Sequence, residues 1–374
     1  MSLPDGAPRP ISRGAARKVL LVLTFVNLFN YIDRFIVPGL ADSLKTSSMH
    51  LDRTQIGLLG TGFILVYAIA SPWFGQLGDV HHRPRLIALG VGIWSVATVL
   101  GGFALGFISL FIARALLGVG EAAYGSIAPS LLADSFPRAL RGRVFAVFYA
   151  AIPIGSALGY AIAGAMAAQF GTWRAAFFVA GAPGLLLAWL LFRMSEVPRG
   201  AQETGDGAIG PHAGPVKGNR WATYRGLIAN RSYLITVLGY AAYTFALGAL
   251  AFWFPDFLAS FHQMTEQRAD YVVGLIAVAT GFVGTFGGGW LGDYVLRYTR
   301  HAYLLVSGIA TLIAVPFVVM ALTARDPRFF FAGLIVAELL MFASTGPINS
   351  AIVSYVAPTQ RATAMAFSIL IMHL

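Results

Sequence analysis

The strongest constraint on this chain is its division into long apolar runs, each close to the length of a membrane-spanning helix. A helix needs about 20 mostly apolar residues to cross the hydrocarbon core of a bilayer. Such runs lie at residues 18–40, 54–78, 86–106, 108–133, 143–168, 173–193, 231–260, 268–292, 302–323 and 328–355, and a last run starts at residue 362. The pattern predicts an all-α, multi-pass membrane protein.

The order of these runs indicates a duplicated architecture. Six spans within residues 1–193 predict an amino-terminal six-helix bundle, and the spans within residues 231–374 predict a second bundle. Residues 194–230 between them, rich in Gly and Pro, are predicted to form a flexible cytoplasmic linker. The last run extends only from residue 362 to 374, which is about 20 Å of helix against a hydrocarbon core of roughly 30 Å. We therefore expect spans 7 to 10, part of span 11 and no span 12 in this chain.

Charge is scarce and unevenly placed. Charged residues make up 11% of the chain, against about 25% in soluble domains. The net charge of +10 could suggest nucleic acid, but the basic residues fall in short loops between apolar runs. Of the 26 Lys and Arg residues, 18 lie on the side of the membrane that holds the N-terminus and 6 on the other. We predict a cytoplasmic N-terminus in the inner (plasma) membrane, and no nucleic-acid partner.

A short motif of Gly, Leu, Asp and Arg occurs twice at the same offset. GQLGDVHHR follows the second run and GWLGDYVLR follows the eighth, so that Gly75, Gly78, Asp79 and Arg83 recur 214 positions later as Gly289, Gly292, Asp293 and Arg297. Glycine permits close approach of a neighbouring helix. Asp79 can pair with Arg83 or Arg143, or cap the N-terminus of a facing helix. We expect these residues to latch one half against the other on the cytoplasmic side and to act as a gate.

The paired motif resembles the loop signature of the major facilitator superfamily. That resemblance implies two six-helix bundles built from inverted repeats, which rock about a site near the midplane of the membrane. The stretches NYIDRFIVPGL, ARALLGVGEAAYGSIAPSLLAD and VFYAAIPIGSALGY, together with RATAMAFSILIMHL at the end, resemble the Spinster branch. Members of this branch are lysolipid and sphingolipid transporters. The resemblance therefore implies a transporter for a lipid-like substrate.

Three ionisable residues inside the runs are candidates for proton coupling, because charges in lipid are rare and costly. Asp33 and Arg114 each lie about 10 Å below the outer surface, counted from the ends of their helices. Glu121 is two turns beyond Arg114 on the same helical face. We expect Arg114 to satisfy either acid as protons bind and leave. A permanent salt bridge between the two helices is the structural alternative. The superfamily resemblance favours proton coupling.

Further polar side chains are candidates for binding substrate. Asn27, Asn30, Tyr31 and Arg34 form a stripe along the first span. Arg34 could bind an anionic headgroup, or could extend to the outer interface. Glu338 lies 217 positions after Glu121 and is expected to be its counterpart in the second bundle. The remaining substrate-binding candidates, both in the second bundle, are Tyr243 and Asn349.

Together these features predict a proton-coupled secondary active transporter of an amphipathic, lipid-like organic anion. A general organic-anion or drug transporter is an alternative within the superfamily, and a passive channel is a further one. A lipid-modifying enzyme is the alternative from another class. The chain has no Cys, and only His373 lies inside a run, so nucleophile–base pairs and metal-ligand sets are lacking. We expect no enzyme activity, no metal and no cofactor. The expected partners are the bilayer, protons and a small amphipathic substrate, and the protein is expected to be a monomer.

Overall fold

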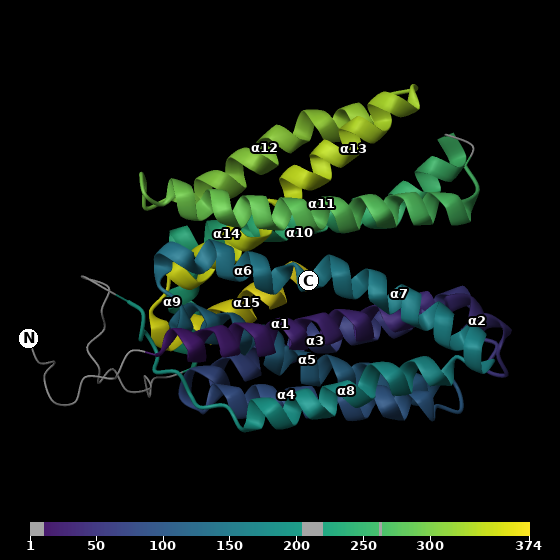
Figure 1. Cartoon of the computed structure of the whole chain (residues 1–374), viewed down its shortest axis with the longest axis horizontal. Coiled ribbons are helices and arrows are strands. Elements are labelled where there is room, and N and C mark those ends of the chain that lie inside the picture. The colour runs from purple at the N-terminus through teal and green to yellow at the C-terminus, as the bar shows by residue number, and fades with distance from the viewer. Residues whose placement is uncertain (1–10, 204–219, 262–263) are drawn as a thin grey trace, which may run out of the picture.

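The structure, a computed structural model, describes residues 11–203, 220–261 and 264–374, and in these residues it is helical (Figure 1). Within this part of the chain, ten helices or helix pairs are long and apolar enough to cross a membrane. They match the first ten predicted runs, and the eleventh run forms a shorter helix, α15 (Arg361–His373). The prediction of an all-α membrane protein with two bundles is therefore confirmed.

The first half of the chain forms one bundle. Its long helices are α1 (Arg13–Gly39), α3 (Arg53–Val80), α4 (Arg83–Gly102), α5 (Phe107–Ser135), α7 (Ala151–Phe170) and α8 (Arg174–Phe192). Glycine lets α4 and α5 pack with almost no separation, because a Cβ added to Gly120 would lie 2.5 Å from the carbonyl oxygen of Gly90. A short helix, α2 (Ala41–Thr46), follows α1 and was not predicted.

The second half forms the other side of the molecule. Its helices are α10 (Arg231–Phe261), α11 (Glu266–Val295), α12 (Ala302–Thr323), α13 (Pro327–Phe342), α14 (Thr345–Ser354) and α15. Figure 1 shows α11 to α13, in green to yellow-green, apart from the purple helices of the first half, whereas α15, in yellow, lies among the helices of the first half and packs against α3 and α5. Part of the predicted linker is also helical, in α9 (Arg220–Ala229), while its residues 204–219 lie outside the described part of the chain.

Two of the predicted single spans are each built from two helices. The fifth consists of α6 (Arg141–Tyr149) and α7, and the tenth of α13 and α14. A proline stands shortly after each break, Pro153 in one case and Pro347 in the other. Proline has no N–H to donate to the carbonyl four residues earlier, which is the carbonyl of Tyr149 or of Ala343. The missing hydrogen bond explains why the helix is interrupted at matching places in the two halves.

The two halves meet at one end of the bundle, which we call the motif face because Asp79 and Asp293 both lie there. At this end α3 packs against α15, and α6 packs against α11. Glycine makes both contacts possible. A Cβ on Gly75 would lie 2.4 Å from the Cβ of Ala366, and a Cβ on Gly289 would lie 2.4 Å from the carbonyl oxygen of Gly142.

Candidate functional site

The first copy of the repeated motif caps a helix of the opposite half. Asp79 is buried, and its Oδ1 and Oδ2 accept hydrogen bonds from the backbone N–H groups of Ala362 and Thr363, each at 3.0 Å. These N–H groups belong to the first turn of α15, where they lack partners within the helix. A carboxylate there also complements the positive end of the helix dipole. Of the three alternative partners predicted for Asp79, the structure shows the helix N-terminus, whereas Arg83 and Arg143 pair with other acids.

The second copy makes the same contact in the reverse direction. Asp293 accepts hydrogen bonds from the backbone N–H groups of Gly142 at 2.8 Å and Arg143 at 3.0 Å, in the first turn of α6. The side chain of Arg143 also approaches Asp293, with 3.5 Å between Nε and Oδ2. Tyr303 donates a further hydrogen bond to Asp293 at 2.9 Å. Each half therefore supplies one carboxylate to the N-terminus of a helix in the other.

The arginine of the first motif copy is used in a separate network. The Nη1 atom of Arg83 lies 2.5 Å from Oδ2 of Asp134, and its Nε lies 2.8 Å from Oε1 of Glu196. On its other oxygen, Asp134 pairs at 2.5 Å with Arg361, the first residue of α15. Because α15 belongs to the second half, Asp134 ties the halves together. Burial explains the geometry, since Arg83, Asp134 and Arg361 are almost fully enclosed and an enclosed charge needs a close partner.

Glu203, on the segment after α8, extends this network. It accepts hydrogen bonds from Arg141 at 2.6 Å and from Arg361. Burial by itself raises the pKa of Glu203, but the charges of Arg141 and Arg361 outweigh that effect and hold the pKa below its ordinary value. Sequence reasoning missed Asp134, Glu196, Glu203, Arg141 and Arg361. The available signal was the repeat itself, because Arg141 and Arg361 each begin a helix and each bond the backbone carbonyl eight residues earlier.

Arg297, the predicted counterpart of Arg83, does not join a latch. Its side chain is exposed, and its guanidinium lies over the ring of Tyr294, 5.8 Å from the centroid. The physical reason lies at the end of α14. Ser354 occupies there the place that Asp134 has near the end of α5, each one residue after the carbonyl that its helix-starting arginine bonds. Ser354 supplies no carboxylate, so the second arginine of the motif has no buried acid to pair with.

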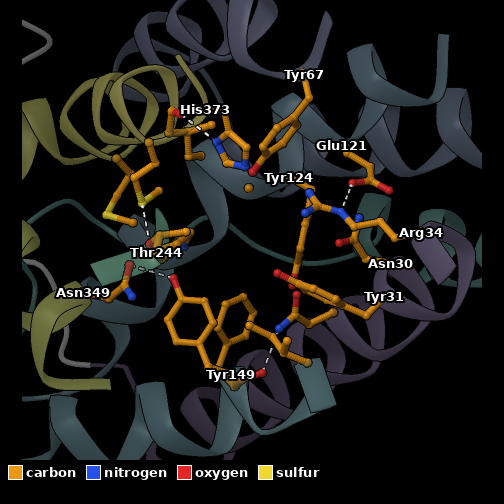
Figure 2. Close-up of a pocket in the computed structure, with 18 of the residues that line it drawn as sticks. Asn30, Tyr31, Arg34, Tyr67, Glu121, Tyr124, Tyr149, Thr244, Asn349 and His373 are labelled. Carbon is orange, nitrogen blue, oxygen red and sulfur yellow. Dashed lines mark hydrogen bonds and ion pairs between the residues drawn. The ribbon is translucent and has the colours of Figure 1, made fainter. Parts of the chain in front are cut away.

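A cavity of about 150 Å³ lies between the two halves (Figure 2). It is lined by side chains of both bundles, and among the predicted residues it includes Asn30, Tyr31, Arg34, Glu121 and Asn349. Lining residues that sequence reasoning did not assign to a site include Tyr67, Tyr124, Tyr149 and His373. The aromatic walls and few fixed charges of the cavity are typical of the lining of a small-molecule site, while its volume is below the roughly 300 Å³ at which such sites usually begin.

Arg34 and Glu121 form an ion pair in this cavity. The Nε atom of Arg34 lies 2.7 Å from Oε2 of Glu121, whose side chain is fully buried, while that of Arg34 is 18% exposed. The guanidinium also lies over the rings of Tyr31 at 5.1 Å and Tyr67 at 4.8 Å from their centroids, contacts that stabilise a cation. The alternative in which Arg34 extends to the membrane interface is therefore wrong.

The predicted pair of Asp33 and Arg114 is present beside it. Nη1 of Arg114 lies 4.0 Å from Oδ1 of Asp33, and the guanidinium donates hydrogen bonds to the backbone carbonyls of Asp33 and Arg34. Thr98 donates a hydrogen bond to the carboxylate of Asp33. Arg114 forms no ion pair with Glu121, which is a correction to the predicted switch. Arg34 points away from Asp33 on α1 and pairs with Glu121, so that each acid has a different arginine as its partner.

The opposite wall of the cavity is a hydrogen-bonded bridge between the halves. The hydroxyl of Tyr149 in α6 donates to Oδ1 of Asn349 in α14 at 3.0 Å, and Nδ2 of Asn349 donates to the hydroxyl of Tyr240 in α10 at 3.2 Å. Figure 2 shows Asn349 and Tyr149 across the cavity from Arg34 and Glu121. Tyr149 and Tyr240 come from different halves, and no pattern within one helix places them together.

Two predicted binding residues lie elsewhere. Glu338 is buried between α13 and α11, where its Oε2 accepts a hydrogen bond from Thr280 at 2.9 Å. The hydroxyl of Tyr243 is bonded to that of Thr345 at 2.9 Å. Neither lines the cavity. Over the part of the chain that is described, His, Asp and Glu side chains form no cluster that could hold a metal ion.

Comparison with known proteins first defines the class. The model of the Major Facilitator Superfamily matches residues 23–374, which is nearly the whole chain. Two helical halves that enclose a polar cavity and exchange helix caps agree with that match. The chain is a member of this superfamily, whose proteins are membrane transporters and not enzymes.

The relatives then identify the branch. Protein spinster of Drosophila melanogaster is 32% identical over 361 residues, covering 94% of this chain and 58% of the fly protein. Protein spinster homolog 1 of Homo sapiens is 33% identical, covering 97% of this chain and 71% of the human protein. The crystal structure of a bacterial homologue of the human lysosomal transporter Spinster, inward-facing and unoccupied, has a TM-score of 0.66 at 26% identity, covering 97% of this chain and 80% of that one. The chain belongs to the Spinster family, as its motifs predicted.

Proposed function

We propose that this chain forms a proton-coupled secondary active transporter of an amphipathic, lipid-like organic anion, of the lysophospholipid or sphingolipid type, which works by alternating access. The observation that supports the proposal is the presence of two buried acid–arginine pairs side by side on α1 and α5, Asp33 with Arg114 and Glu121 with Arg34. One of these pairs lines the cavity between the halves.

The proton step follows from the chemistry of the pair in the cavity. A guanidinium that is bonded to Glu121 is partly neutralised and has fewer N–H groups for an anionic substrate. When Glu121 takes a proton, its charge is lost and Arg34 becomes the uncompensated cation of the cavity. An anionic headgroup then replaces the carboxylate as its partner. Proton binding to Glu121 and anion binding are thereby coupled through the guanidinium of Arg34.

Asp33 and Arg114 form the second element of the proposed coupling. Arg114 donates to the backbone carbonyls of both Asp33 and Arg34, so the turn of α1 that carries Arg34 depends on where Arg114 lies. Protonation of Asp33 weakens its attraction for Arg114 and frees that turn to shift. Asn30, Tyr31 and Asn349, which line the same cavity, are proposed to bind the polar part of the substrate.

The caps at the motif face are the proposed gate. We place the motif face in the cytoplasm, because the basic residues concentrate on that side, and the protein in the cell's plasma membrane as a monomer. The bundles are proposed to comprise residues 1–193 and 231–374. The bonds of Asp79 and Asp293 to the helices of the opposite half then close the inner side, and their release opens it.

The test is uptake of a labelled lysophospholipid into proteoliposomes, driven by a pH gradient. Glu121→Gln cannot take up a proton, and it keeps an oxygen within reach of Arg34. We expect proton-driven uptake to fall to the level of protein-free liposomes while exchange of labelled for unlabelled substrate persists. The matched control is Asp42→Asn, because the side chain of Asp42 is 94% exposed and its described partner is the surface residue Lys45. Undiminished pH-driven uptake by Glu121→Gln would contradict the proposal. Competition by a non-lipid organic anion at equal concentration would favour the general anion carrier instead.

A further inference from the structure

A second cavity lies at the motif face, away from the one between the halves. Its volume is about 520 Å³, within the range of small-ligand sites. It is an open cavity bordered by the start of α1, the end of α5, the turn that follows α5 and the segment after α8. Its described lining residues are Ile11, Arg13, Ala16, Arg17, Ser135, Phe136, Pro137, Leu140 and Gln202. We call it the basic cavity.

Two arginines give the described lining of the basic cavity a positive charge. Arg13 and Arg17 lie one turn apart on α1, so their side chains share a face. Among the described residues, the lining contains no carboxylate. Within the described part of the chain, the acids next to it in sequence are Asp134 and Glu203, which are already paired with Arg83, Arg361 and Arg141. An anion is therefore the ligand that this charge favours.

The walls and the depth of the basic cavity favour a lipid as the source of that anion. Phe136, Pro137 and Leu140 supply apolar surface to the same cavity as the arginines, and Leu140 is 40% exposed. Arg17 stands directly before the apolar run of the first span, at the level where a bilayer holds its phosphate groups. The arginines suit the phosphate oxygens of a lipid headgroup, and the apolar residues suit the glycerol and upper acyl carbons attached to it.

The cavity is also held in shape by bonds that do not involve a ligand. Ser135 donates its hydroxyl hydrogen bond to the carbonyl of Leu131 at 2.7 Å. Gln202 is adjacent to Glu203, which is fixed by Arg141 and Arg361. We propose that the basic cavity is a binding site for the phosphate-bearing headgroup of an anionic phospholipid, separate from the transport cavity, with Arg13 and Arg17 as its phosphate ligands.

The test measures lipid binding by the whole chain in neutral detergent micelles, by native mass spectrometry and by the shift in melting temperature. The probes are phosphatidylglycerol, phosphatidylcholine and inorganic phosphate. We expect saturable binding and stabilisation by phosphatidylglycerol alone. The double substitution Arg13→Gln and Arg17→Gln is expected to weaken that binding by about thirty-fold, the size expected for the loss of two cationic contacts.

The matched control removes two other exposed arginines near the linker, Arg225→Gln with Arg231→Gln, and leaves the basic cavity intact. We expect its affinity for phosphatidylglycerol to remain within about three-fold of the unmodified chain. Equal loss in the two double variants would overturn the site, since general surface charge would then explain binding. Equal stabilisation by inorganic phosphate, abolished by the Arg13 and Arg17 substitutions, would overturn the lipid as the ligand. Neither readout depends on transport.

Discussion

The exchanged helix caps make a quantitative prediction about the balance between closed and open motif faces. Asp79 and Asp293 each accept two backbone N–H bonds from the first turn of a helix in the other half. Replacing either by Asn keeps one acceptor oxygen but removes the negative charge and the second bond. A partly buried charge at a helix end contributes up to about 2 kcal/mol, and loss of a cap costs about 1 kcal/mol.

Each single substitution is therefore expected to shift the closed–open equilibrium by about 1–2 kcal/mol, or about 5- to 30-fold. The two caps lie in different interfaces, α3 with α15 and α11 with α6. Their effects should add in the double variant Asp79→Asn with Asp293→Asn, because separate contacts without shared partners are independent. Their sum is about 2–4 kcal/mol toward the open state.

Distances between spin labels at the motif face measure this equilibrium. The chain has no Cys, so labels can be attached at Arg85→Cys in the first half and Tyr298→Cys in the second without background sites. Both positions are exposed. Double electron–electron resonance should show a longer distance whose population grows from the single to the double variant, while Asp42→Asn leaves the distribution unchanged. An unaltered distribution in the double variant would refute the assignment of the caps as the latch.

Two further substitutions test the closure of the motif face. Gly75→Ala should open the motif face in the same label experiment, because the new Cβ would lie 2.4 Å from the Cβ of Ala366 and 2.8 Å from the carbonyl oxygen of Ala362. The control is Gly57→Ala on the same helix, whose Cβ would meet nothing within 4 Å and should have no effect. Equal distance distributions for the two alanine variants would refute the close contact. Arg141 and Arg361 hold the pKa of Glu203 below its ordinary value of about 4.5. Glu203 should therefore stabilise the fold above pH 4.5, and this contribution should be lost as the pH falls through the lowered pKa. Thermal melts of Glu203→Gln should lack this part of the acid dependence, and identical pH profiles of melting temperature for the variant and the unmodified chain would contradict the pairing.

The sequence predicted the spans and the Asp33–Arg114 ion pair because both follow from counting residues along individual helices. Apolar length alone locates a membrane span, and depth counted from the helix ends places Asp33 level with Arg114, which the structure confirms. The partner of Glu121 could not be found in this way. Spacing tells which face of its own helix a residue occupies, but Arg34 reaches Glu121 because of how α1 and α5 are rotated against each other, and that depends on packing throughout the bundle.

The acids of the motif-face network were missed for a different reason. Asp134 lies at the end of a predicted span, and Glu196 and Glu203 lie in a predicted polar loop. A charged residue at such positions is ordinarily solvated. Only the fold shows that the segment after α8 returns across the ends of the helices and buries these groups against Arg83 and Arg361. Hydropathy alone does not locate the breaks in the fifth and tenth spans, because it does not register a missing hydrogen bond at Pro153 or Pro347.

The latch is symmetric in its caps and asymmetric in its charges, and this difference bears on how the halves separate. On the α3–α15 side, opening must part Arg361 from Asp134 and Glu203 as well as release the cap of Asp79. On the α6–α11 side, the ion pair is that of Asp293 with Arg143, whose side chain is 42% exposed. Breaking a buried pair leaves an uncompensated charge and costs far more than breaking an exposed one. Separation at the motif face should therefore begin between α6 and α11, with the contact of α15 the last to be lost.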